Sequence, residues 1–127
     1  MIPELNILLA EDNDLNAEIA IELLKTKRAS VHRAEYGKRA VELFVRNSPG
    51  TYQAILMDIQ MPVMNGLEAA RAIRKLGRED AVSIPIIAMT MTSSTSVKPL
   101  FFLLFDLFMR LKSFMVHLPL RFHHTTL

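Results

Sequence analysis

The sequence predicts an α/β protein whose parallel β-sheet carries helices on both faces. Short apolar runs that do not alternate with polar residues recur along residues 5–90, and such runs are typical of strands buried on both faces. Segments with apolar residues at helical spacing separate these runs, so strands and helices alternate along the chain. A parallel sheet with right-handed connections follows from this alternation.

The first strand and the first helix are expected near the N-terminus. Residues 5–10 read LNILLA, and the acidic run that ends this strand offers Asn13 or Asp14 as the cap of a helix over residues 15–27. The apolar residues of this helix that recur every four positions are expected to face the sheet. They are Leu15, Ile19 and Leu23.

The later elements follow from the same two patterns. Asn65, with Glu68 three positions later, resembles a capping box, so a helix is expected from there to Gly77. Pro85 stands near the start of the last apolar run, where a missing N–H group is tolerated. The remaining expected elements are a strand over 30–34, a helix over 38–47, and strands over 53–58 and 84–89.

Three of the predicted strands end in polar residues. Glu11 and Asp12 follow the first strand. Asp58 ends the third strand, and Thr90 follows the fourth. Because the carboxyl ends of parallel strands meet at one edge of a sheet, these side chains are expected to converge there. Three carboxylates repel one another unless a cation lies among them, and a few hard oxygen ligands indicate Mg²⁺. Taken singly, each acid also fits a helix cap or a solvated turn.

Three stretches of the sequence resemble a known family when they are taken together and in order. They are LLAEDNDLNAEIAIELL, AILMDIQMPVMNGLEAARAIR and IPIIAMT. These stretches are similar to the receiver domain of two-component response regulators, and most similar to the receivers of hybrid histidine kinases. The resemblance covers residues 5–90 and implies a flavodoxin-like, three-layer α/β/α fold with a parallel sheet of strand order 2-1-3-4.

The resemblance also implies what the site residues do. Asp58 is then the phosphoacceptor, which takes a phosphoryl group from a phosphohistidine on a histidine kinase or a histidine phosphotransfer protein. Glu11, Asp12 and Asp58 hold Mg²⁺, together with the backbone carbonyl of Gln60. The hydroxyl of Thr90 binds the phosphoryl group. Such a chain is a phosphoacceptor signalling domain that assists its own phosphorylation, rather than an enzyme.

The family pattern breaks after Thr90. The family continues with a small residue, a fourth helix and a fifth strand that ends in Lys-Pro. Here Met91 takes the small position, and Lys98-Pro99 comes much too early. A deletion would bring Lys98 to this place and make it a candidate contact for the phosphoryl group, and chance is the alternative. The fifth strand and helix are therefore expected to be absent or replaced.

The break divides the chain into an incomplete receiver-like domain over 1–92 and a divergent apolar tail over 93–127. Six of the seven phenylalanines lie in the tail, and acidic residues almost vanish there. Translation from a shifted reading frame, or of unspliced sequence, is one hypothesis for its origin. Asp106, Arg110 and Lys112 interrupt the apolar run, which disfavours a membrane span.

Composition disfavours several other classes. The chain of 127 residues has no cysteine, so neither a disulfide nor a thiolate metal site is available. The N-terminal stretch MIPELNILLAEDND has no basic leader before its apolar run, unlike a signal peptide, and a cytoplasmic location is expected. The tail carries net positive charge but no cluster of Lys and Arg, so nucleic-acid binding is not expected.

Other functions fit the same residues. A receiver-shaped module without a functional site lysine would dock on a kinase without being phosphorylated, and a truncated or frame-shifted receiver would be inactive. A Mg²⁺-dependent phosphatase also forms an aspartyl-phosphate, but it needs a second Asp where Gln60 stands. The three acids favour the phosphoacceptor, and the displaced lysine favours the docking module.

Overall fold

The computed structural model of the chain describes residues 5–89. Four parallel strands form one sheet in the order β2-β1-β3-β4, as expected. The strands are β1 (Leu5–Ala10), β2 (Ala29–Ala34), β3 (Ala54–Asp58) and β4 (Ile86–Met89). The expected loss or replacement of a fifth strand and helix falls outside the described residues, as does the predicted boundary at residue 92.

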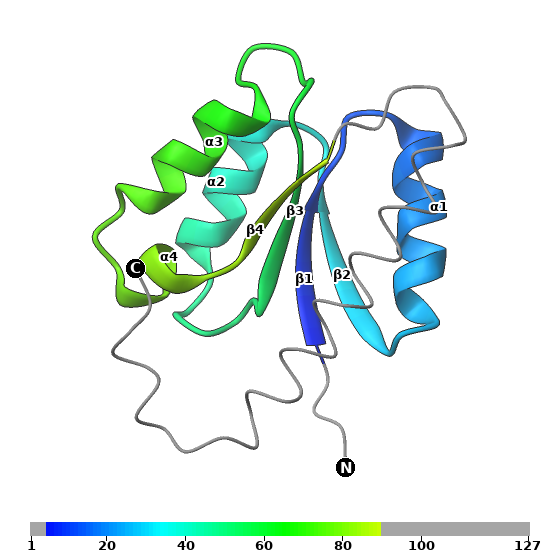
Figure 1. Cartoon of the computed structure of the whole chain (residues 1–127), viewed down its shortest axis with the longest axis horizontal. Coiled ribbons are helices and arrows are strands. Elements are labelled where there is room, and N and C mark those ends of the chain that lie inside the picture. The colour runs from blue at the N-terminus through cyan, green and yellow to red at the C-terminus, as the bar shows by residue number, and fades with distance from the viewer. Residues whose placement is uncertain (1–4, 90–127) are drawn as a thin grey trace. The chain divides into compact units, whose positions relative to one another are not determined.

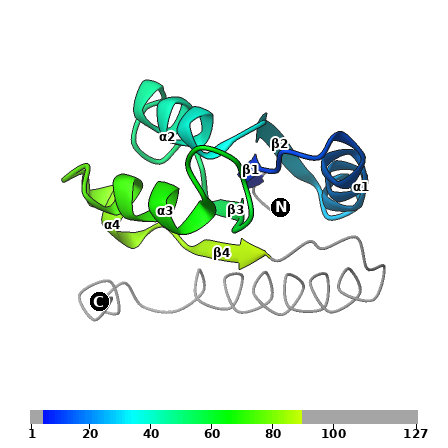
Figure 2. The same cartoon turned by 90° about the horizontal axis from the view of Figure 1, so that it is seen from above.

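Helices cover both faces of the sheet in the described part of the chain. They are α1 (Asp14–Lys25), α2 (Gly37–Arg46), α3 (Gly66–Arg74) and α4 (Glu79–Ser83). Helix α1 lies on one face, and α2 and α3 lie on the other (Figure 1). Figure 2 shows the same separation from above. Helix, sheet and helix therefore form the three layers that the sequence predicts.

The two central strands, β1 and β3, are buried on both faces. Every residue of β3 is buried, and Asn6 alone is partly exposed in β1. Strand β2 lies at an edge, and exposed Ser30 and His32 interrupt its burial. The apolar runs without alternation therefore mark the two strands whose carboxyl ends carry the acidic residues.

Helix α1 faces the sheet with smaller residues than the sequence pattern indicated. Its buried residues are Ala17, Ala20 and Leu24. In contrast, Leu15 is 64% exposed and Leu23 is 36% exposed, so the predicted buried face was wrong. The prediction rested on the recurrence of Leu15, Ile19 and Leu23 every four positions, and of these Ile19 is half-buried. The spacing of the buried set is equally helical, and alanine side chains let the helix lie close to the sheet.

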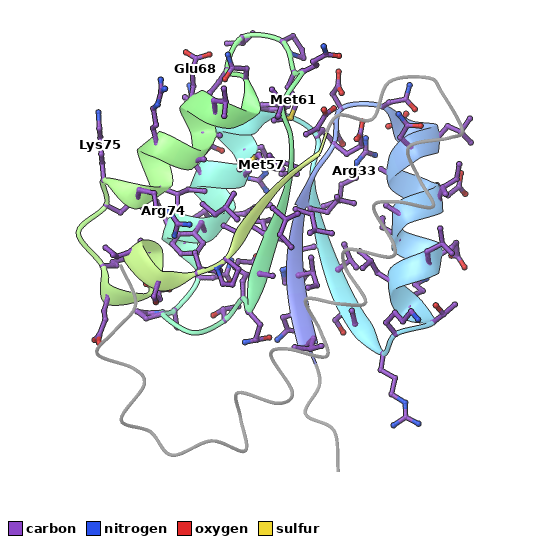
Figure 3. The ribbon with its side chains drawn as sticks, in the orientation of Figure 1. Arg33, Met57, Met61, Glu68, Arg74 and Lys75 are labelled. Carbon is purple, nitrogen blue, oxygen red and sulfur yellow. The ribbon has the colours of Figure 1, made fainter. Side chains whose placement is uncertain are left out.

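The short helix α4, between α3 and β4, was not expected from the sequence. Nη1 of Arg74, on α3, donates hydrogen bonds to three carbonyl oxygens near the end of α4 (Figure 3). The acceptors are Ala81, Val82 and Ile84, at 3.0, 3.0 and 2.7 Å. A helix this short is not stable by propensity alone, so contacts with α3 account for it.

A second arginine joins the start of α4 to the end of α2. Nε and Nη2 of Arg78 donate to the carboxylate of Asp80 at 3.0 and 2.8 Å, and Nη1 donates to the carbonyl oxygen of Phe44 at 3.1 Å. The guanidinium carbon also lies 4.8 Å from the centre of the Phe44 ring. Phe44 belongs to the core between the sheet and helices α2 and α3. The contacts of Arg78 therefore join the start of α4 to that core.

We predict that Arg74→Met lowers the free energy of unfolding by about 2 kcal/mol, because three carbonyl groups lose their donor. Urea unfolding followed by circular dichroism measures the change. Arg71→Met is the matched control, since Arg71 lies on the same helix, is exposed, and makes no side-chain hydrogen bond within residues 5–89. Equal stability of the two variants would contradict the role assigned to Arg74.

Candidate metal centre

Three carboxylates converge at the carboxyl ends of β1 and β3. Glu11 and Asp12 follow β1 directly, and Asp58 is the last residue of β3. The two strands are paired neighbours with Ala10 opposite Met57, so Glu11 comes to lie beside Asp58. One carboxylate oxygen from each of the three acids lies within 4.8 Å of the others. The predicted convergence is confirmed for these acids.

Two of the three acids are buried. Glu11 is 1% exposed and Asp58 is 4% exposed, whereas Asp12 is exposed. A backbone N–H group donates to one oxygen of each buried acid. Asn13 donates to Oε1 of Glu11 and Gln60 donates to Oδ1 of Asp58, both at 3.1 Å. The other oxygen of Glu11, Oε2, is buried and has no hydrogen-bond partner among the described residues.

Burial raises the pKa values of both buried acids. Desolvation raises the pKa of Glu11 to about 7, although the hydrogen bond from Asn13 opposes this rise. The negative charges of Asp58 and Asp12 add to the rise of the Glu11 pKa. Desolvation also raises the pKa of Asp58, against the hydrogen bond from Gln60, and the charge of Asp12 adds to that rise. In the absence of a cation, Glu11 is therefore partly protonated near neutral pH.

The arrangement fits a divalent metal ion. All the donors are carboxylate oxygens, which are the hard ligands that Mg²⁺ prefers, and the buried Oε2 of Glu11 is available as a ligand. A cation among the three carboxylates also removes the repulsion that raises their pKa values. The side chains of Glu11, Asp12 and Asp58 are therefore suited to hold Mg²⁺.

Three further residues were expected at the site. Gln60 lies in the loop after β3, where its N–H group donates to Asp58. The metal contact expected of the Gln60 carbonyl stays a prediction. Thr90 and Lys98 lie outside the described residues, so their expected contacts with a phosphoryl group stay predictions too.

Helix α3 begins in contact with the strand that carries Asp58. The N–H group of Gly66 donates to the carbonyl oxygen of Ile59 at 3.0 Å, and a Cβ atom on Gly66 would overlap the carbonyl oxygen of Asp58. Asn65 and Glu68 form the predicted capping box, with hydrogen bonds of 2.9 and 3.1 Å. Glycine is therefore required at residue 66 because the backbone of α3 packs directly against that of Asp58.

Sequence reasoning missed one residue at this end of the sheet. Arg33, near the end of β2, donates from Nε and Nη2 to the carbonyl oxygen of Glu11 at 3.1 and 2.9 Å. Its Nη1 also forms an ion pair with Oδ1 of Asp14 at 2.9 Å. The available signal was an arginine at the carboxyl end of a strand that neighbours β1 in the expected sheet.

Comparison with protein families assigns the fold and site to a class. Residues 7–100 match the response regulator receiver domain, and the chain belongs to this family. Receiver domains are phosphoacceptor signalling modules of two-component phosphorelays rather than conventional enzymes. The resemblance stated from the sequence is therefore confirmed.

Similar relatives include hybrid histidine kinases. The chain is 41% identical over 92 residues to hybrid signal transduction histidine kinase I of Dictyostelium discoideum. It is 42% identical over 90 residues to the aerobic respiration control sensor protein ArcB of Escherichia coli. These matches cover 71% and 70% of the chain but 5% and 11% of the two relatives. The chain thus spans a small part of the length of these proteins.

Solved structures with the same fold include receiver domains. The chain is similar to the receiver domain of a sensor histidine kinase from Pseudomonas aeruginosa, with 34% identity, a TM-score of 0.62, and coverage of 73% of this chain and 72% of that chain. That structure has a magnesium ion coordinated in its active site cleft. A chemotaxis protein from Vibrio cholerae, 23% identical with a TM-score of 0.62, shares the fold. None of the helices between residues 5 and 89 is long and apolar enough to cross a membrane.

We predict that metal-free protein loses stability as the pH rises between 4.5 and about 7, the ordinary and folded-state pKa values of Glu11. In this window the folded state keeps a proton that the unfolded chain has lost, so rising pH favours unfolding until the folded carboxyl has also ionised. Urea unfolding in the presence of a chelator, at several pH values across the window, measures the slope.

Glu11→Gln should remove most of this pH dependence, because glutamine does not titrate. Glu18→Gln, at an exposed position of α1, is the control and should keep the parent slope. The explanation fails if the Glu11→Gln variant and the parent protein lose stability equally over the same window.

We predict that Gly66→Ala lowers the free energy of unfolding by about 1–3 kcal/mol, the usual cost of overpacking. Glycine-to-alanine changes at unstrained positions usually stabilise a protein. The sign of the change in the free energy of unfolding therefore tests the close approach of residue 66 to Asp58. Denaturant titration measures the difference. An alanine variant as stable as the parent would show that the backbone contact is not tight.

Proposed function

We propose that the chain is a phosphoacceptor in a His-to-Asp phosphorelay and that Asp58 receives the phosphoryl group. The observation that carries the proposal is the placement of Asp58 at the end of β3, buried and within 4.8 Å of two other carboxylates. The N–H group of Gln60 holds its Oδ1 and thereby orients the carboxylate. A carboxylate that is fixed in this way is suited to nucleophilic attack.

The proposed step exchanges one bond to phosphorus for another. An oxygen of Asp58 attacks the phosphorus of a phosphohistidine on the donor protein. The new O–P bond forms as the N–P bond breaks, and the imidazole nitrogen keeps the electron pair of that bond. The product is an aspartyl-phosphate. Asp58 must be ionised to attack, and burial, which raises the pKa of this carboxyl group, opposes that ionisation.

The residues proposed to hold Mg²⁺ are Glu11, Asp12 and Asp58, with the backbone carbonyl of Gln60. When bound, Mg²⁺ supplies positive charge beside the phosphoryl oxygens. The all-oxygen donor set supports this proposal. The magnesium ion in the 34% identical receiver domain from Pseudomonas aeruginosa supports it independently.

The remaining proposals concern residues and partners beyond the described site. The Thr90 hydroxyl and Lys98 are proposed as contacts of the phosphoryl group. The phosphodonor is proposed to be a histidine kinase or a histidine phosphotransfer protein, and the similarity to hybrid histidine kinases supports this class. A cytoplasmic location fits the role, because the ATP that charges a histidine kinase is found there.

A second candidate is a receiver-like module that docks on a kinase without being phosphorylated. The observation that favours it is the position of Lys98, which follows Thr90 much more closely than the receiver pattern requires. Without a lysine near the phosphoryl oxygens, less charge is neutralised in the transition state. The two candidates differ in whether Asp58 accepts a phosphoryl group.

We predict that acetyl phosphate with Mg²⁺ adds one phosphoryl group to the full chain and that Asp58→Asn abolishes the addition. Intact-mass spectrometry measures the adduct, and hydroxylamine should remove it because an acyl phosphate reacts with this nucleophile. The control is Glu18→Gln, an exposed position on α1, which should be phosphorylated as the parent is.

Two results would contradict the phosphoacceptor role. One is an adduct of equal yield on Asp58→Asn. The other is a folded parent protein that Mg²⁺ stabilises but that forms no adduct, since binding of a ligand to the folded state alone raises apparent stability. The second result would favour the docking module.

A further inference from the structure

The guanidinium group of Arg33 holds the backbone between β1 and α1. Nε and Nη2 form a fork on the carbonyl oxygen of Glu11, at 3.1 and 2.9 Å, and Nη1 contacts Oδ1 of Asp14 at 2.9 Å. The Arg33 side chain is 20% exposed, so the fork on the carbonyl oxygen is mostly shielded from water, whereas the Asp14 side chain is 92% exposed. Figure 3 labels Arg33 at this end of the sheet, beside the start of α1. One side chain from β2 thus holds the start of the β1–α1 connection at Glu11 and contacts its other end at Asp14.

This connection carries two of the three acids of the metal centre. The carbonyl group of Glu11 and the N–H group of Asp12 belong to the same peptide plane, so a fork on that carbonyl also fixes the direction in which the chain leaves for Asp12. A further bond, from the Glu11 N–H group to the carbonyl oxygen of Ala34 at 3.1 Å, ties the same residue to β2. The position of Asp12 therefore depends on contacts with β2.

Asp12 depends on its backbone more than the other two acids do. Glu11 and Asp58 are buried, and each accepts a hydrogen bond from a backbone N–H group. The carboxylate of Asp12 is exposed, and within residues 5–89 no backbone N–H group donates to it; its side chain interacts with that of Asp58. In the absence of a cation, repulsion from the two buried acids pushes it outward. Its approach to within 4.8 Å of them is a property of the loop that Arg33 fixes.

We propose that Arg33 is a positioning residue of the metal centre, which holds the Glu11–Asp12 peptide so that Asp12 faces the other two acids and thereby strengthens Mg²⁺ binding. This inference rests on the proposed role of the three acids as magnesium ligands. Groups that orient metal ligands from outside the coordination shell typically change metal affinity about 10–100-fold when they are removed. The fork suits this task, since two N–H groups of a rigid guanidinium that meet at one carbonyl oxygen restrict its position more than a single N–H group would.

Charge alone predicts the opposite effect. Arg33 is a cation near the site, so its removal would reduce repulsion of Mg²⁺ and tighten binding. The ion pair with Asp14 at 2.9 Å offsets part of that charge, and solvent around the exposed Asp14 carboxylate screens it further. We therefore expect the loss of positioning to exceed the electrostatic gain. The two effects differ in sign, which makes them separable by experiment.

The test measures Mg²⁺ dissociation constants by isothermal titration calorimetry on the full chain. The variants are Arg33→Met, which removes fork and charge, and Arg33→Lys, which keeps the charge without the fork. Arg39→Met is the matched control, because Arg39 is a partly exposed arginine on α2 whose ion pair with Glu42, at 3.4 Å, lies within a helix. The free energy of unfolding without metal is measured for each protein in parallel.

The expected result is Mg²⁺ binding about tenfold weaker in Arg33→Met and several-fold weaker in Arg33→Lys, with Arg39→Met unchanged. A purely structural role of Arg33 would lower the free energy of unfolding and leave the dissociation constant of the folded protein unchanged. That result, or tighter binding by Arg33→Met, would overturn the proposal.

Arg33→Lys keeps the test decisive if Arg33→Met does not fold, because a lysine variant that binds Mg²⁺ as the parent does would also overturn it. A parent protein that binds no Mg²⁺ would overturn the magnesium site itself and this inference with it. If the parent protein binds Mg²⁺ and the Arg33 variants bind it with the same dissociation constant, the inference about Arg33 is overturned and the magnesium site stands.

Discussion

The burial of two carboxylates at the ends of adjacent parallel strands is the constraint on which the rest of the structure depends. Glu11 and Asp58 are removed from water by the same sheet that brings them together. Their desolvation opposes folding, and two backbone N–H groups offset part of it. The rest of β1 and β3 is almost entirely apolar, so the unfavourable desolvation of carboxylates is confined to this edge of the sheet. Departures from an apolar interior are expected at functional sites, and this edge is therefore where the chemistry of the protein is concentrated.

The elements that carry the site could be predicted from the sequence because their signals are local. The run AILMD is buried throughout and forms β3, and the pair Asn65 and Glu68 makes the expected capping box. The convergence of Glu11, Asp12 and Asp58 followed from one further rule, that parallel strands present their carboxyl ends at the same edge. The local sequence pattern and the sheet topology together were sufficient to predict that the three acids lie close together.

The features that escaped prediction depend on contacts between distant parts of the chain. Helix α4 has no strong signal of its own, and its end is held by Arg74 from α3. The buried face of α1 was misassigned because Ala17 and Ala20 pack closely against the sheet while larger Leu15 does not. Arg33 is one of many arginines in the sequence, and only the pairing of β2 with β1 brings it to Glu11.

The pairing of β1 with β3 has a consequence for how the protein folds. The acids of the candidate metal centre stand at the ends of two strands that are separated in sequence by α1, β2 and α2, so this long stretch of chain must close before the three acids meet. Parallel pairing of this kind is slow relative to helix formation. Residues 5–34 hold β1, α1 and β2 and supply only two of the three acids. A metal ion that binds the finished edge would therefore slow the unfolding of completed molecules and leave the early steps of folding unaffected.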